Sequence, residues 1–196
     1  MGRTHSTGCG KRHGDARVSA KAADVLRLTL VGGVPFMLLT GRRDAGVLLV
    51  LTAITAVVAR AIRAPAVADL IFVALLTVAS YVIAFGGVGS WDLDNDVAHV
   101  VLPAAAAPLL LCAAVRSGAV ARPVSGPRGT AVALVVVTAA LTLALGTAWE
   151  LVEFASDSLL GTNMSQGYDD TIRDLIADSV GALTGAVLAV RLWPRR

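Results

Sequence analysis

The chain has 196 residues, of which 56% are hydrophobic and only 16% charged, and its mean hydropathy is +0.72. Soluble domains are usually about 45–50% apolar, so this composition indicates a membrane protein. A net charge of +3 and an isoelectric point of about 9.3 would also fit a nucleic-acid-binding protein, and the positions of the basic residues must decide. The two cysteines, Cys9 and Cys112, lie in a polar segment and an apolar run, so no disulfide is expected.

Residues 1–24 are polar, basic and glycine-containing, and they predict a disordered cytoplasmic tail. Residues 25–196 predict one transmembrane domain. Its apolar runs lie at approximately 25–41, 45–62, 65–87, 97–115, 130–150 and 175–193. Most approach the ~20 residues that a helix needs to cross a bilayer, and helices satisfy their backbone polar groups internally. The expected fold is therefore an all-α polytopic membrane protein with about six transmembrane helices in one bundle.

The basic residues predict the orientation of these spans. All of them except Arg42, Arg43 and Arg173 fall on the side of the N-terminus if six spans are crossed. Positive residues favour the cytoplasmic side, so both termini are expected in the cytoplasm. The expected location is the cell membrane, that is, the inner or plasma membrane. Anionic lipid is then the expected partner of the basic face, and no nucleic acid is required. Most acidic residues show the opposite bias and gather at three junctions.

The first junction is WDLDNDVAHVVLP at the start of the fourth span. Asp96 and His99 are three residues apart, so both can project from one face of a helix. Two interpretations remain open. Asp96 or a neighbour could simply cap the helix while His99 sits in the wet interface, or the pair could belong to a polar site.

The second junction is GTAWELVEFASDSLLG at the end of the fifth span. Glu150, Glu153 and Asp157 are spaced i, i+3 and i+7, which places them on one stripe. Carboxylates near a helix C-terminus oppose the helix dipole, so capping does not explain them. The alternatives are a solvated acidic face beyond the bilayer and a stripe that faces protein, and the intervening apolar residues favour the second.

The third junction is YDDTIRDLIAD at the start of the sixth span. Asp170 suits an N-cap and Asp174 the first turn, but Asp178 lies about two turns into the helix. The same stripe continues to Gly181 and Gly185, a small-xxx-small pattern that favours close helix packing. The carboxylates are therefore expected to point into the bundle.

A buried group of carboxylates requires shared protons, a basic partner such as His99 or Arg173, or a bound cation. Oxygen-rich ligation suits Mg²⁺, Ca²⁺ or Mn²⁺, and a histidine also permits Zn²⁺. We therefore predict that the side chains of the three junctions converge at the outer boundary as a polar site, with a divalent cation as the possible cofactor. The candidate metal ligands are His99, Glu150, Glu153, Asp174 and Asp178, and Asp96 and Asp170 complete the candidate site.

These residues resemble the YjdF-like family of bacterial inner-membrane proteins and, more remotely, the VanZ-like family. The resemblance covers roughly residues 90–190 and rests on the helix start with His99, on WELVEF, and on YDDTIRDLIADSVGALTGA. One position departs from the pattern, because Asn95 stands where those families carry an aspartate four residues before the histidine. The resemblance implies a multi-pass membrane protein of poorly defined role and no established reaction.

Three functions remain open from the sequence. The protein could bind or process a lipid-linked or cell-wall-related substrate at the outer face, and it could be an enzyme there. It could be a small ion- or proton-coupled transporter with Asp69 at the inner end of the path, although Asp69 could equally pair with a neighbour such as Arg63. It could also be a structural accessory subunit. The middle of the helices is mainly Ala, Val and Leu, which favours the outer-face binding site.

Overall fold

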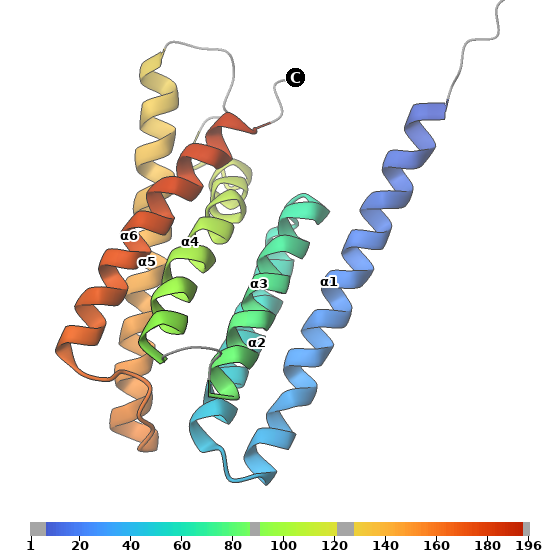
Figure 1. The fold of residues 1–196 in the computed structure, drawn as a ribbon. Coiled ribbons are helices and arrows are strands. Elements are labelled where there is room, and N and C mark those ends of the chain that lie inside the picture. The colour runs from blue at the N-terminus through green and yellow to red at the C-terminus, as the bar shows by residue number, and fades with distance from the viewer. Residues whose placement is uncertain (1–6, 87–90, 121–127, 194–196) are drawn as a thin grey trace, which may run out of the picture.

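The computed structural model describes residues 7–86, 91–120 and 128–193, and the regular structure in this part of the chain is entirely helical. The helices, shown in Figure 1, are α1 (Thr7–Leu39), α2 (Arg43–Ile62), α3 (Ala66–Ala84), α4 (Trp91–Arg116), α5 (Arg128–Leu160) and α6 (Tyr168–Arg191). The predicted all-α bundle is confirmed. The last three helices extend beyond the predicted apolar runs, because hydropathy marks only apolar segments whereas these helices continue through polar residues at the acidic end.

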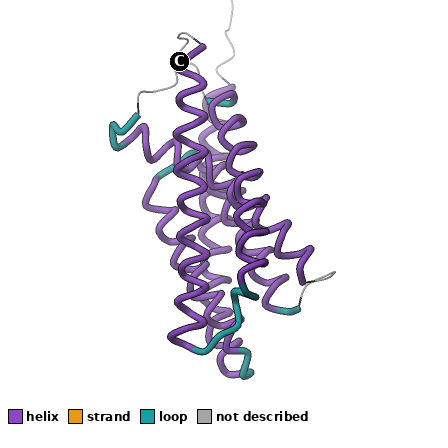
Figure 2. The backbone as a smooth tube through the Cα atoms, turned by 90° about the vertical axis from the view of Figure 1, so that its left-hand side faces the viewer, coloured by secondary structure: helices purple, strands orange, loops and turns teal. Residues whose placement is uncertain are grey.

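The bundle consists of two groups of three helices. α1, α2 and α3 pack together, α4, α5 and α6 pack together, and α3 joins the groups through its contact with α4. Figures 1 and 2 show the helices running along one long axis in alternating directions. The end that carries the α1–α2 turn, the start of α4 and the α5–α6 loop is called the acidic end. The opposite end carries the α2–α3 turn and the C-terminal end of α6, and is called the basic end.

The N-terminal segment differs from its prediction. Residues 7–24 were expected in a disordered tail, whereas α1 begins at Thr7 and runs through them without a break. The physical reason is local composition, since the alanines of this segment are strong helix formers. The hydroxyl of Ser19 also donates to the carbonyl of Asp15, 3.0 Å away, inside this part of the helix. Residues 1–6 lie outside the described residues.

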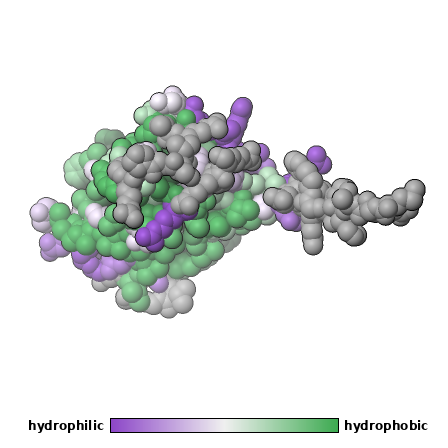
Figure 3. Space-filling model, turned by 90° about the horizontal axis from the view of Figure 1, so that it is seen from above, coloured by the Kyte–Doolittle hydropathy of each residue, from purple (hydrophilic) through white to green (hydrophobic). Residues whose placement is uncertain are grey.

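The surface of the bundle suits a bilayer. Five helical stretches of the described chain are long and apolar enough to cross a membrane: Gly14–Leu39, Arg43–Ile62, Ala66–Ala84, Leu93–Arg116 and Thr130–Leu160. Large apolar side chains such as Val57, Val78 and Val136 are exposed along them, and Figure 3, which views the molecule from above, shows hydrophobic residues over much of the visible surface. Such contiguous apolar surface is rare on a soluble monomer.

Helix α6 is the exception, because its first half carries charged residues and it does not reach that composition. Its two sides differ sharply. Asp174 and Asp178 are buried against the bundle, whereas Ile176, Val180 and Leu183 are exposed. This division lets an apolar surface face outward while the carboxylates stay inside. A membrane crossing by α6 remains a prediction.

The packing of α6 against α4 depends on two glycines. A Cβ atom on Gly185 would lie 2.5 Å from the carbonyl oxygen of Ala104, and one on Gly181 would overlap the carbonyl oxygen of Val100. The two backbones therefore approach more closely than any larger residue would allow. The small-xxx-small packing predicted from the sequence is confirmed, and it draws the first half of α6 onto the start of α4.

The basic end is held by a buried ion pair between α1 and α3. Arg27 donates from Nη2 to Asp69 at 2.5 Å and from Nε to the carbonyl of Ala56 at 2.9 Å, and both charged side chains are almost fully buried. A further pair links Arg27 to the half-exposed Asp24 at 3.1 Å. The suggested pairing of Asp69 with Arg63 is thus wrong. Sequence proximity favoured Arg63, but Arg63 ends α2 in a left-handed conformation, while Arg27 reaches Asp69 from the facing helix.

Loss of this ion pair should destabilise the packing of α1 against α3. We expect Asp69→Asn to reduce the free energy of unfolding by about 3–5 kcal/mol, because it leaves the guanidinium of Arg27 buried without its main counter-charge. Chemical unfolding of the purified protein in detergent would measure this. The matched control is Arg60→Gln, which removes an exposed partner of Asp24 and should cost no more than about 1 kcal/mol. Equal losses in the two variants would contradict the assignment.

Candidate functional site

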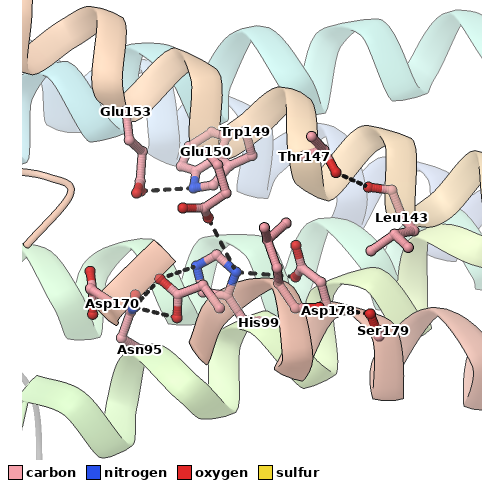
Figure 4. A network of polar contacts seen from close by, with 12 residues as sticks. Asn95, His99, Leu143, Thr147, Trp149, Glu150, Glu153, Asp170, Asp178 and Ser179 are labelled. Atoms are coloured by element: carbon pink, nitrogen blue, oxygen red, sulfur yellow. Dashed lines mark hydrogen bonds and ion pairs between the residues drawn. The ribbon is translucent and has the colours of Figure 1, made fainter. Parts of the chain in front are cut away.

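The candidate site lies near the acidic end, where α4, α5 and α6 meet around His99 (Figure 4). The Nδ1 atom of His99 is 3.1 Å from Oδ1 of Asp178 and 3.9 Å from Oε1 of Glu150. Its Nε2 atom is 3.6 Å from Oδ2 of Asp174. The four side chains are all buried. The imidazole therefore sits among carboxylates from two other helices, with acids facing both of its ring nitrogens.

Asn95, one turn before His99 on α4, completes one side of this group. Its amide nitrogen lies 3.0 Å and 2.9 Å from the two carboxylate oxygens of Asp174 and donates to that carboxylate. In the sequence, Asn95 stood out only as a departure from the family pattern. The structure assigns the partners of His99 to α5 and α6 rather than to a residue of α4. It gives Asn95 the separate role of orienting Asp174.

Two carboxylates of the group have oxygen atoms that make no hydrogen bond within the described residues. Within the described residues, both oxygens of Glu150 and Oδ2 of Asp178 are buried without a hydrogen-bond partner. The side chain of Glu150 is 6% exposed and points toward His99 in Figure 4. Buried acceptors are almost always satisfied in folded proteins, so each orphan calls for a physical explanation. Here the orphaned oxygens lie beside the imidazole, where a proton or a cation would meet them.

Space for Asp178 is made by a glycine on the facing helix. A Cβ atom at Gly146 of α5 would overlap Oδ2 of Asp178. Gly146 lies four residues before Glu150, so it occupies the same face of α5, one turn away. Gly146 was not among the predicted site residues. Its signal was weak, because glycine is common in membrane helices and nothing in the local sequence showed that it faces a carboxylate.

The remaining predicted site residues do not contact His99. Glu153 is buried but accepts a hydrogen bond from the indole nitrogen of Trp149 at 2.8 Å. Asp96 pairs with Arg173 at 2.7 Å on the partly exposed rim between α4 and α6. Asp170 accepts from the backbone amide of Gln166 at 3.1 Å and so stabilises the turn into α6. The predicted convergence therefore holds for His99, Glu150, Asp174 and Asp178 as a geometric group, with Glu153 beside it.

The loop between α5 and α6 is built around Asp157. One carboxylate oxygen accepts from the hydroxyl of Thr162 at 2.6 Å and from the amide of Met164 at 2.7 Å, and the other accepts from the amide of Ser165 at 2.9 Å. Asp157 had been placed on the acidic stripe of α5. In the structure, its hydrogen bonds instead hold the loop that turns the chain back, so that α6 begins beside α4.

A cavity of about 800 Å³ adjoins the group. Most of its walls come from α2, α3, α4 and α5, with Asp178 of α6 and part of the α5–α6 loop, and it runs from the α1–α2 turn at the acidic end toward the middle of the bundle. Asn95, His99, Glu153 and Asp178 line its polar wall, and Leu48, Leu76, Leu102 and Leu145 are among its apolar lining residues. Binding pockets typically occupy about 300–1,000 Å³ and combine apolar walls with a few polar groups.

The geometry of the group allows it to hold a metal ion. One ligand atom each from His99, Glu150 and Asp174 lie within 4.8 Å of one another. A cation with oxygen ligands at about 2.3–2.6 Å separates opposite ligands by roughly 5 Å, so only small side-chain adjustments are needed. Carboxylates suit Mg²⁺, Ca²⁺ and Mn²⁺, whereas the imidazole adds affinity for Zn²⁺. Of the predicted ligands, Glu153 is farther from this trio because Trp149 holds it.

Together, the fold and the site define a polytopic helical membrane protein with a buried group of histidine and carboxylates near one end. A sequence model of the family described as "Predicted membrane protein (DUF2238)" matches residues 36–195, and the chain belongs to that family. This is the YjdF-like family predicted from the motifs, while the remoter similarity to VanZ-like proteins remains a prediction. No curated protein and no solved structure matches the chain.

The contact between Gly146 and Asp178 can be tested by a double-mutant cycle. Gly146→Ala alone should lower the free energy of unfolding by roughly 1–3 kcal/mol, because its methyl group displaces the carboxylate of Asp178. In an Asp178→Ala background the same change should cost little or become stabilising, since alanine is the better helix former. Thermal unfolding of the four proteins gives the coupling energy. An equal cost in both backgrounds would contradict the proposed contact.

Proposed function

We propose that the protein binds a divalent cation at the acidic end of its membrane bundle through His99, Glu150 and Asp174. One observation carries the proposal: the carboxylate of Glu150 is buried, has no hydrogen-bond partner within the part of the chain that the structure describes, and lies within ion-pair distance of His99. A polar group in that state usually belongs to a site that is completed by a ligand or a proton.

The charge balance supports a cation. Glu150, Glu153, Asp174 and Asp178 contribute four carboxylates, and His99 contributes at most one positive charge. Asn95 and Trp149 donate hydrogen bonds to two of these carboxylates but carry no charge. In a poorly solvated interior, repulsion among unpaired carboxylates must be relieved either by protons or by a metal ion. A single divalent cation neutralises two of the carboxylate charges, which would otherwise require two protons. It also gives the oxygens of Glu150 a partner.

Cation binding should be visible as a change in stability. A ligand that binds only the folded protein stabilises it by about 2.7 kcal/mol at a hundredfold excess over its dissociation constant. Purified protein in detergent should therefore melt at a higher temperature with Mg²⁺, Ca²⁺, Mn²⁺ or Zn²⁺, each tested separately, than with a chelator. Glu150→Gln should abolish this increment, because the amide removes the ligand charge and keeps the shape of the side chain.

The matched control for this experiment is Asp169→Asn, which removes an exposed carboxylate at the start of α6. That variant should retain the full cation-dependent increment. The cation proposal fails if no ion raises the melting temperature and Glu150→Gln is more stable than the parent protein. In that case the group would share protons and serve helix packing, which is the accessory-subunit alternative.

The proposed orientation places the site outside the cytoplasm. The support is the strong bias of basic residues toward the basic end, together with the positive-inside tendency of membrane proteins. The N-terminal end of α1 and the C-terminal end of α6 both point to that end in Figure 1, as an even number of crossings requires. The proposed location is the cell membrane, with anionic lipid against the basic face.

Cysteine labelling in intact cells would test this orientation. In a Cys9→Ser background, a cysteine at Ser158, an exposed position near the end of α5, should react with an impermeant thiol reagent. A cysteine at Ser117, exposed after α4 at the basic end, should react only after the cells are permeabilised. The native Cys112 is buried, so labelling of the Cys9→Ser protein without an added cysteine measures the background. The reverse labelling pattern would place the site in the cytoplasm.

The transporter alternative has less support. Asp69, the residue proposed at the inner end of the path, forms an ion pair with Arg27. Both residues belong to the group of α1, α2 and α3, away from the candidate site. The buried hydroxyls of Thr52, Thr77 and Thr142 each donate to a carbonyl one turn earlier in their own helices, so they do not form a chain across the bundle. An ion path requires polar groups at successive depths. We therefore favour a binding site confined to the acidic end.

A further inference from the structure

We propose that the cavity beside the candidate site binds one phospholipid of the surrounding bilayer, with an acyl chain between α2 and α5 and the phosphate against Arg43. The inference goes beyond the cation site, because it rests on the cavity and its rim. Either ligand could therefore bind in the absence of the other.

The apolar part of the cavity opens toward the bilayer. Ile54 on α2 and Leu145 on α5 line the cavity and are nevertheless 55% and 44% exposed. Val152, nearer the acidic end of α5, also lines the cavity and is partly exposed. Because these lining side chains keep so much exposed surface, we infer that the cavity is open between the two helices. A hydrocarbon chain can enter there without crossing a polar surface.

The cavity has a long apolar part and a charged end, as the binding site of an amphiphilic molecule requires. Along α2 its lining residues extend from Arg43 to Thr55, which corresponds to roughly 18 Å at 1.5 Å per residue. Its deep part is lined by apolar residues such as Phe72 and Ala106, whereas its charged residues lie toward the acidic end. One acyl chain fits this depth, and a second chain can remain in the bilayer against the exposed faces of α2 and α5.

The rim supplies the positive charge that a phosphate requires. Apart from His99, Arg42 and Arg43 are the basic residues among those lining the cavity. Arg42 is partly engaged, since its Nη1 donates to the carbonyl of Ala84 at 3.0 Å and its guanidinium lies over the ring of Phe85. Arg43 is exposed at the start of α2 and is therefore positioned to receive the phosphate. Guanidinium groups bind phosphate oxygens in a bidentate fashion.

The acids of the cavity wall limit where the head group can lie. Glu153 and Asp178 would repel a phosphate, so it must stay at the rim while the acyl chain passes the polar wall. Asp44 also lines the rim directly after Arg43, so the phosphate must contact the arginines on the side away from this carboxylate. Trp149 covers one oxygen of Glu153 and presents an amphipathic ring to the cavity. Tryptophan is common where polar and apolar regions of a bilayer meet, which fits this level of the cavity.

Native mass spectrometry of the delipidated full-length protein can test the proposal. The probes are phosphatidylglycerol, diacylglycerol as its counterpart without phosphate, and a polyprenyl phosphate, each measured in the presence of a chelator. We expect one phosphatidylglycerol per chain and at least tenfold weaker binding of diacylglycerol. Arg43→Gln should weaken phosphatidylglycerol binding about tenfold, through loss of a charge-assisted hydrogen bond, whereas Arg17→Gln at the far end should not.

A second pair of variants tests the position of the chain. Leu145→Trp fills the cavity and should abolish retention of the lipid, while Val136→Trp, at an exposed position of α5 nearer the basic end, should leave it unchanged. If Leu145→Trp does not fold, a photoreactive residue at Leu51 should crosslink to the lipid and one at Leu183, exposed on α6, should not. Equal retention of diacylglycerol, preference for the polyprenyl phosphate, or crosslinking at Leu183 alone would each overturn the proposal.

The melting experiment with cations and the lipid-binding experiment can give negative results independently of each other. Lipid binding in the presence of a chelator with no cation-dependent melting would remove the metal and keep the lipid. Cation-dependent melting with no retained phospholipid would do the reverse.

Discussion

The rest of the structure depends on an electrostatic constraint, which is that several carboxylates must be kept together around one imidazole in a membrane bundle. Each element of the acidic end contributes to meeting it. Asn95 holds Asp174, Gly146 makes room for Asp178, and Trp149 draws Glu153 to one side. These contacts place the charges but do not neutralise them. The excess negative charge is therefore the feature from which the cation proposal follows.

Close backbone packing makes this arrangement possible. The carboxylates of α6 reach His99 only because Gly181 and Gly185 bring α6 against the backbone of α4. The loop folded around Asp157 sets the point at which α6 begins. In a bilayer the helices gain little from hydrophobic association with one another, so small residues and buried polar contacts must supply the specificity. The same contacts that pack α6 against α4 therefore also place the carboxylates of the candidate site.

The two ends of the bundle use buried charge differently. At the basic end, Arg27 and Asp69 are matched in charge and joined by hydrogen bonds, and such a pair fixes how α1 meets α3. At the acidic end the charges are unmatched, two carboxylates have oxygens without a hydrogen-bond partner among the described residues, and a cavity lies beside them. A paired charge completes a structure, whereas unmatched charge beside a cavity is what a ligand site requires. The arginines on the rim of that cavity add the opposite sign of charge a short distance away.

The sequence by itself determined the class of the protein and the residues of interest. Hydropathy identified the apolar helices, and helical spacing placed Glu150 and Asp178 on faces that point inward, because both depend on local periodicity. Spacing along one helix contains no information about the facing helix. Tertiary structure alone therefore decided that His99 meets Asp178, that Glu153 turns to Trp149, and that Asp69 pairs with Arg27 rather than Arg63. The same limit applies to Gly146, whose importance exists only because a carboxylate from a distant helix packs against it.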